Sequence, residues 1–282
     1  MGTRHILFDA DYLSSLKNWR AEAEANLRGQ ESWLALLGLF WFEQGANRFG
    51  SHESNDIVLP IDNLPNYLGA FELRDGQVHL RVQPGVSITV DGKVSNNIVL
   101  KPDVSGEPSE IRVDSLVMIV VQRGERLGLR VWDHNNPRRT KFPGRTWYEP
   151  GENYLAPARF STYQSAKEIP ITNILGDTND TLLAGYVEFE LDGRALRLDA
   201  LESDHGRLFI IFKDKTSQKE TYSAGRYLHT AAPQDGKVLL DFNRAYNPPC
   251  AFTDFATCPL PPRQNHLALR IEAGERFEKF VG

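Results

Sequence analysis

The sequence predicts a mainly β protein with one N-terminal helix, a β-sandwich, and a second antiparallel β domain that is a barrel or a sandwich. Three observations support this fold class. Apolar residues recur at helical spacing in one stretch alone. Elsewhere, short apolar or alternating runs are separated by turn residues. Three of these separations are Asp-Gly pairs, at residues 75–76, 91–92 and 192–193, and this pair is a strong signal for a two-residue hairpin.

The helical stretch spans residues 9–28. Tyr12, Leu16 and Trp19 follow one another at three- and four-residue steps and would form one apolar face, while charged residues occupy the other. The next apolar run, residues 33–42, is expected to be buried and to form a short turn followed by a strand.

Short strand patterns fill residues 47–132 with no helical segment between them, which is typical of a small β-sandwich. A second set follows residue 159. Between the two sets, prolines and a basic cluster mark a change in composition. The expected organisation is an N-terminal helix and connector at residues 1–37, a β-sandwich at 38–135, a proline-rich linker at 136–157 and a second β domain at 158–282.

The basic cluster contains Arg138, Arg139, Lys141 and Arg145. Charge runs are usually solvated, so a solvated linker is one interpretation. The other is that Arg138 and Arg139 bind an anionic group, because guanidinium groups match the geometry of carboxylates and phosphates.

The composition is that of a folded, soluble protein, with 41% hydrophobic and 24% charged residues and a net charge of −5. A negative chain does not attract nucleic acid or an anionic membrane, so neither is expected as a partner. Two cysteines suit a reducing compartment, and the longest apolar runs are too short to span a bilayer, so we expect a cytoplasmic protein. Glycine-rich nucleotide, Walker, nucleophile-elbow and HExxH motifs are absent, and no cofactor or metal is expected.

The chemically most unusual stretch is residues 241–274, which is rich in proline and holds both cysteines. Asn247 precedes two prolines, so the chain must turn there, and a rigid loop on a sheet edge is a common way to build a binding site. Asp241 and Asn243 would share one face if the strand before them continued. We expect a small polar or anionic ligand here. The expected ligand-binding residues are Arg226 for charge, Asp241, Asn243 and Asn247 for hydrogen bonds, and Tyr222, Tyr227 and Tyr246 as walls.

Three alternatives remain open. The polar residues of this stretch can serve only to hold the loop together. The domain can be a hydrolytic enzyme that uses Asp241 or Glu220 as acid or base, or Cys250 as nucleophile with His266 as the base nearest in sequence. The protein can also be a scaffold, in which the sandwich and the Trp-containing linker bind a protein partner.

The two cysteines, Cys250 and Cys258, allow three interpretations of their own. They can be buried inert thiols, or a redox pair or local disulfide. As metal ligands they would need two more, from residues such as His229, His266, Asp241 or Asp254.

Several long motifs resemble a known family. They are residues 33–41 (WLALLGLFW), 147–150 (WYEP) with 158–160 (ARF), 185–189 (GYVEF), 219–227 (KETYSAGRY) and 240–262. On these motifs the chain resembles, over nearly its whole length, the uncharacterised bacterial family called domain of unknown function 1684. The resemblance implies no activity, because none is assigned to the family.

A second resemblance lies within residues 38–132. Gly50-Ser51 followed by residues 55–59 (NDIVL) is similar to the opening of forkhead-associated (FHA) domains, which are β-sandwiches that bind phosphothreonine. Ser51 stands where those domains carry an arginine, and residues 66–69 (NYLG) stand where they carry Ser-Arg-x-His. The resemblance therefore implies an FHA-like sandwich without the residues that bind phosphate.

Overall fold

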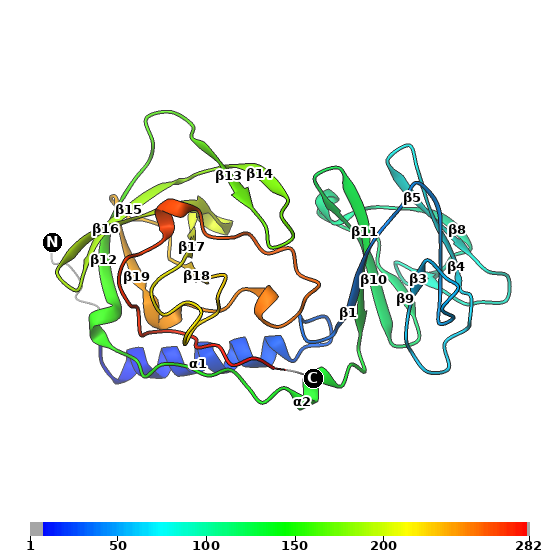
Figure 1. The fold of residues 1–282 in the computed structure, drawn as a ribbon, viewed down its shortest axis with the longest axis horizontal. Coiled ribbons are helices and arrows are strands. Elements are labelled where there is room, and N and C mark those ends of the chain that lie inside the picture. Colours follow the sequence, from blue (N-terminus) through cyan, green and yellow to red (C-terminus); the bar gives the residue numbers. More distant parts are fainter. Residues whose placement is uncertain (1–7, 281–282) are drawn as a thin grey trace. The chain divides into compact units, whose positions relative to one another are not determined.

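The structure is a computed structural model that describes residues 8–280, and it forms two compact units. One unit combines the N-terminal helix, up to Asn26, with the chain from Phe142 onward, and we call it the split unit. The other unit is Leu27–Lys141, which we call the inserted unit (Figure 1).

The inserted unit is a β-sandwich, as the strand pattern predicts. A continuous core fills the space between its two sheets and includes Phe49, Phe71, Leu80, Met118 and Leu129. One sheet has the order β1 (Leu36–Trp41), β11 (Arg126–Asp133), β10 (Leu116–Arg123), β9 (Ile111–Val113), β6 (Thr89–Val90) and β7 (Lys93–Val94). The other has the order β3 (Ile57–Val58), β2 (Gly45–Gly50), β4 (Gly69–Arg74), β5 (Gln77–Val82) and β8 (Asn97–Leu100).

The split unit is built on a six-stranded antiparallel sheet, so the predicted mainly β fold with one N-terminal helix is confirmed. Its core includes Val187, Leu198, Ile210, Leu228 and Leu240. The sheet has the order β18 (Arg226–His229), β17 (Leu208–Phe212), β16 (Arg194–Glu202), β15 (Gly185–Leu191), β12 (Leu155–Ser161) and β19 (Lys237–Asp241), and a separate hairpin pairs β13 (Glu168–Thr172) with β14 (Thr178–Leu182).

The three Asp-Gly pairs that were expected to form hairpins do form tight turns. They join β4 to β5, β6 to β7, and β15 to β16. In each pair both residues have positive φ, for example 53° at Asp192 and 65° at Gly193. This is the backbone of a type I′ turn, whose twist matches that of the two strands.

The helix α1 (Ala10–Leu27) packs within the split unit, although about 115 residues of the inserted unit separate it from the rest of that body in sequence. Leu16 is buried, and the Trp19 ring lies 5.6 Å from the Trp147 ring. No helix in the described chain is long and apolar enough to cross a membrane.

Residues 136–157, expected as a linker, are divided between the two units. α2 (Arg138–Lys141) ends the inserted unit, and the chain from Phe142 runs along α1 in the split unit (Figure 1). Arg139 donates to the backbone carbonyls of Arg28 and His134, so this basic side chain is used inside its own unit. The remaining short elements are 3-10 turns: η1 (Asp103–Ser105), η2 (Glu152–Tyr154), η3 (Asp204–Gly206), η4 (Phe242–Arg244), η5 (Pro249–Ala251) and η6 (Arg263–Asn265).

Candidate functional site

Asp241 and Asn243 lie together, but not as neighbours on a strand. β19 ends at Asp241 and η4 begins at Phe242, so the strand does not continue and the two side chains do not share a strand face. Asp241 Oδ1 accepts hydrogen bonds from the Tyr12 hydroxyl (2.9 Å) and from the Asn243 backbone N–H (3.1 Å). The Asn243 amide donates to the Tyr12 hydroxyl and to the Gly151 carbonyl, both at 3.0 Å. These contacts fasten α1 and the Gly151 segment to the end of the sheet.

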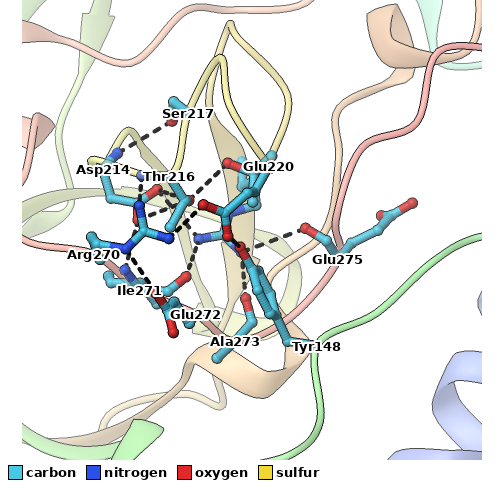
Figure 2. Close-up of polar contacts among 12 residues, drawn as sticks. Tyr148, Asp214, Thr216, Ser217, Glu220, Arg270, Ile271, Glu272, Ala273 and Glu275 are labelled. Atoms are coloured by element: carbon cyan, nitrogen blue, oxygen red, sulfur yellow. Dashed lines mark hydrogen bonds and ion pairs between the residues drawn. The ribbon is translucent and has the colours of Figure 1, made fainter.

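Arg226 is completely buried, and its hydrogen bonds go to protein atoms. Nη2 lies 3.3 Å from Asp214 Oδ1 and donates to the Ile271 carbonyl at 2.9 Å, while Nη1 donates to the Ala273 carbonyl. Burial lowers the pKa of Arg226, and the Asp214 charge opposes that shift. Figure 2 shows Asp214, Ile271, Ala273 and Glu275 gathered around this point. The guanidinium of Arg226, which was predicted to bind a ligand, therefore holds the segment after Ile271 against the sheet.

The three predicted tyrosines hold the proline-rich loop. Tyr222 donates from its hydroxyl to the Cys250 carbonyl at 2.8 Å, and Tyr227 donates to the Pro259 carbonyl at 3.0 Å. Tyr246 packs edge-on against Tyr227, with ring centroids 5.9 Å apart. Burial raises the pKa of all three hydroxyls, that of Tyr246 to about 12, so they stay protonated, and those of Tyr222 and Tyr227 act as donors.

Asn247 differs from the other predicted residues because it lines a cavity of about 360 Å³. The cavity lies wholly in the split unit, and its walls are residues 142–146, residues 275–280, Asn247 and Phe252. A volume near 300 Å³ or above is typical of small-molecule sites.

The Asn247 side chain carries an unpaired buried oxygen at this cavity. The residue is 3% exposed. Its Nδ2 donates to the Arg276 carbonyl at 2.8 Å, which fixes the amide orientation because a carbonyl only accepts. Among residues 8–280, Asn247 Oδ1 has no hydrogen-bond partner. A buried polar atom without a partner is costly, and it therefore marks a place where another molecule would bind favourably.

A buried ion pair stands beside this oxygen. Arg145 Nη1 lies 2.9 Å from Glu275 Oε2, with the two side chains 10% and 1% exposed. The same Oε2 accepts the Asn247 backbone N–H at 2.7 Å. Burial raises the pKa of Glu275 to about 7, although Arg145 and Asn247 oppose the shift. Arg145 Nε is buried and, within the described chain, donates to nothing.

Aromatic rings form the apolar part of the cavity wall. Phe142 meets Phe252 and Phe280 edge-on, with centroids 5.9 and 5.4 Å apart. The Arg145 guanidinium lies 5.0 Å from the centroid of the Phe252 ring. Phe277 completes the wall and packs on Tyr222. The cavity thus combines flat apolar sides with an unpaired acceptor and an unpaired donor.

Sequence reasoning placed Asn247 in this site but missed Arg145 and Glu275. Arg145 was assigned to the basic linker, where charge runs are usually solvated. Glu275 follows Gly274, which has a φ of 76° and would clash with two backbone carbonyls if it carried a Cβ. Nothing in the local pattern separates this buried acid from the exposed ones near it.

The residues named for the alternative of a hydrolytic enzyme are not among those that line the cavity. Glu220 accepts the Tyr148 hydroxyl at 2.7 Å and pairs with Arg270, a chain of contacts visible in Figure 2. The Nε2 of His266 is within 3.2 Å of the Pro261 carbonyl, and no contact joins this imidazole to either cysteine. In the described part of the chain, no group of three or more His, Cys, Asp or Glu residues is placed to hold a metal ion.

Comparison with known proteins gives a family-model match over part of the chain and names no activity. No curated protein matches the chain. The chain is similar to the solution NMR structure of an uncharacterized protein from Haloarcula marismortui, at 33% sequence identity, over 49% of this chain and 79% of that one, with a TM-score of 0.41. A protein-family model matches part of the chain, and the residues before 140 lie outside that match. Residues 140–276 match the model described as "Protein of unknown function (DUF1684)". They include every strand of the six-stranded sheet of the split unit and most of the cavity wall.

Proposed function

We propose that the split unit binds a small polar molecule in the cavity beside Asn247. The observation that carries this proposal is the unpaired Asn247 Oδ1, held 3% exposed in the wall of a cavity of about 360 Å³. A binding partner that donates a hydrogen bond to this oxygen removes the cost of leaving it unsatisfied.

The ligand we propose has a donor and an acceptor on one edge and a flat body. Its N–H or O–H meets Asn247 Oδ1. Its carbonyl or carboxylate oxygen accepts from Arg145 Nε, a buried atom of another cavity-lining residue that has no hydrogen-bond partner within the described chain. The rings of Phe142, Phe252 and Phe277 line the cavity and offer an apolar wall on which a planar group can pack. Amides, lactams and the hydrogen-bonding edges of nucleobases have this chemistry.

The test is ligand-observed NMR on the full chain, with a panel of primary amides, lactams, nucleobases and simple carboxylates as probes. Hits are then repeated with Asn247→Ala and with Asn173→Ala as a matched control. Asn173 is also buried, at 8% exposed, but its side-chain oxygen is satisfied by Leu175 and Asp177. Probes that lose their signal with Asn247→Ala and keep it with Asn173→Ala support the site. A folded protein with no hits, or hits that survive Asn247→Ala, would refute it.

For the inserted unit, we propose an FHA-like fold without phosphopeptide binding. The sandwich supports the first part. For the second, Ser51 Oγ donates to the Leu64 carbonyl at 2.8 Å, so this hydroxyl serves the loop rather than a phosphate. The test is titration with a phosphothreonine peptide, for which we expect no binding.

The proposal also includes a reducing, cytoplasmic location, which rests on both cysteines being free thiols. Fractionation of cells that express the native gene would test it.

A further inference from the structure

The two thiols of the proline-rich loop lie against one another. The Cys250 backbone N–H donates to Cys258 Sγ at 3.1 Å. Only three covalent bonds separate that nitrogen from the Sγ of Cys250 itself. The two sulfurs therefore lie close to one another, as the side-chain hydrogen bond between the two thiols also indicates. Both residues are free thiols in this structure.

Two tyrosines hold this arrangement in place before any oxidation. Tyr222 binds the carbonyl of Cys250, and Tyr227 binds the carbonyl of Pro259, the residue after Cys258. A tyrosine from outside the loop thus holds Cys250 at its own carbonyl and Cys258 at the carbonyl of the next residue. Because these contacts already hold the two thiols close together, forming a disulfide between them costs little conformational entropy.

The two thiols are not equivalent. Cys250 is half-buried, whereas Cys258 is 4% exposed. The hydrogen bond with the Cys258 thiol lowers the pKa of Cys250, and the same contact raises the pKa of Cys258. The more accessible thiol is thus also the one that more readily gives the thiolate, which is the attacking species in thiol chemistry.

We propose that Cys250 and Cys258 form a reversible dithiol–disulfide site, in which Cys250 attacks a low-molecular-weight disulfide and Cys258 resolves the product. In the first step the Cys250 thiolate bonds to one sulfur of the oxidant, and the other sulfur leaves as a thiolate. In the second step Cys258, after losing its proton, displaces the remaining half as a second thiolate. Two electrons pass to the oxidant, and the two protons of the cysteines end on the two released thiols.

The experiment uses the full, folded chain with glutathione disulfide as the oxidant. Both cysteines lie in one tryptic peptide, residues 245–263, so mass spectrometry after trypsin reads their state directly. We expect the wild-type peptide to lose two hydrogens, to retain no glutathione, and to regain the hydrogens with dithiothreitol.

The serine variants separate the two roles. Cys258→Ser should retain one glutathione on Cys250, because the resolving thiol is gone, and Cys250→Ser should take up none while folded. The wild-type result does not depend on how the variants fold. A wild type that stays reduced, or that keeps glutathione without forming the disulfide, would overturn the proposal. Faster labelling of Cys250→Ser than of Cys258→Ser would overturn the order of attack.

Discussion

The carboxylate of Asp214 and the guanidinium of Arg226 lie 3.3 Å apart, with both side chains 1% exposed, so protein encloses the whole ion pair. Asp214 Oδ2 also accepts the Ile271 backbone N–H at 2.7 Å, and Arg226 donates to the Ile271 carbonyl. The pair therefore binds both the N–H and the carbonyl of Ile271, and so it fixes the segment that leads to Glu275.

Arg226→Ala is expected to destabilise the split unit by about 3–5 kcal/mol, because it leaves the Asp214 charge buried without its partner. Urea unfolding measures this. Arg270→Ala is the control, since Arg270 pairs with Glu220 and Glu272 at the surface and its loss should change stability far less. An Arg226→Ala protein as stable as the Arg270→Ala protein would contradict the structural role.

Asn247→Ala should cost much less stability than Asn265→Ala, although both residues are buried. Asn265 uses its whole side chain, accepting from the Asp199 N–H and donating to the Asp199 and Ile211 carbonyls. In the Asn247 side chain the nitrogen has a hydrogen-bond partner, and the oxygen has none among the described residues. With about 1 kcal/mol per buried hydrogen bond, the difference should be about 2 kcal/mol. Thermal and urea unfolding of the two variants give the comparison. Equal losses would mean that Asn247 Oδ1 is satisfied within the protein.

Glu275 should make the stability of the split unit depend on pH. Its pKa is raised from 4.5 to about 7 in the folded protein, so between these values the folded state binds more protons than the unfolded state. The contribution of Glu275 is thus greatest below the lower value and is lost as the pH rises through about 7. At about 1.4 kcal/mol per pKa unit, the full change is on the order of 3 kcal/mol.

The measurement is urea unfolding of wild type and Glu275→Gln at about pH 5 and about pH 8. The variant cannot ionise, so its stability relative to wild type should be higher at the upper pH than at the lower. A stability difference that does not vary with pH would show that the carboxyl of Glu275 titrates in its ordinary range.

Tyr12→Phe should loosen α1. The change removes the hydroxyl that donates to Asp241 and accepts from Asn243, with an expected cost of about 1–2 kcal/mol. Hydrogen exchange of α1 peptides followed by mass spectrometry should show faster exchange. Leu13→Ala is the matched control on the same helix, because Leu13 is 40% exposed. Equal exchange rates in the two variants would count against the role of Tyr12.

The sequence predicted what depends on local patterns. Asp75-Gly76 and its two counterparts fixed three hairpins, because few dipeptides adopt positive φ at both positions. The apolar face of residues 9–28 predicted a packed helix, but periodicity does not say against what. The partners of that helix, Trp147 and Asp241, lie far away in the chain.

The chemistry of the site was harder to predict for a related reason. Arg226 in a strand and Asn247 before two prolines are equally unusual in sequence. Both terminal nitrogens of Arg226 bind protein atoms, whereas the side-chain oxygen of Asn247 has no partner among the described residues. The difference comes from Asp214 and from residues 271–276, which only the folded chain brings to them. Charge type and spacing cannot distinguish a buried structural ion pair from a binding group.

The division of the split unit along the chain has a consequence for biosynthesis. α1 leaves the ribosome before the rest of the split unit, because the acceptor of its Tyr12 hydroxyl follows 229 residues later. All strands of the inserted unit lie within Leu27–Lys141, so the sandwich can fold before the strands that α1 packs against have been synthesised. Until the strands of the six-stranded sheet are made, the apolar face of α1 has no native surface to cover it. The newborn chain should therefore be most prone to chaperone capture and aggregation in that interval.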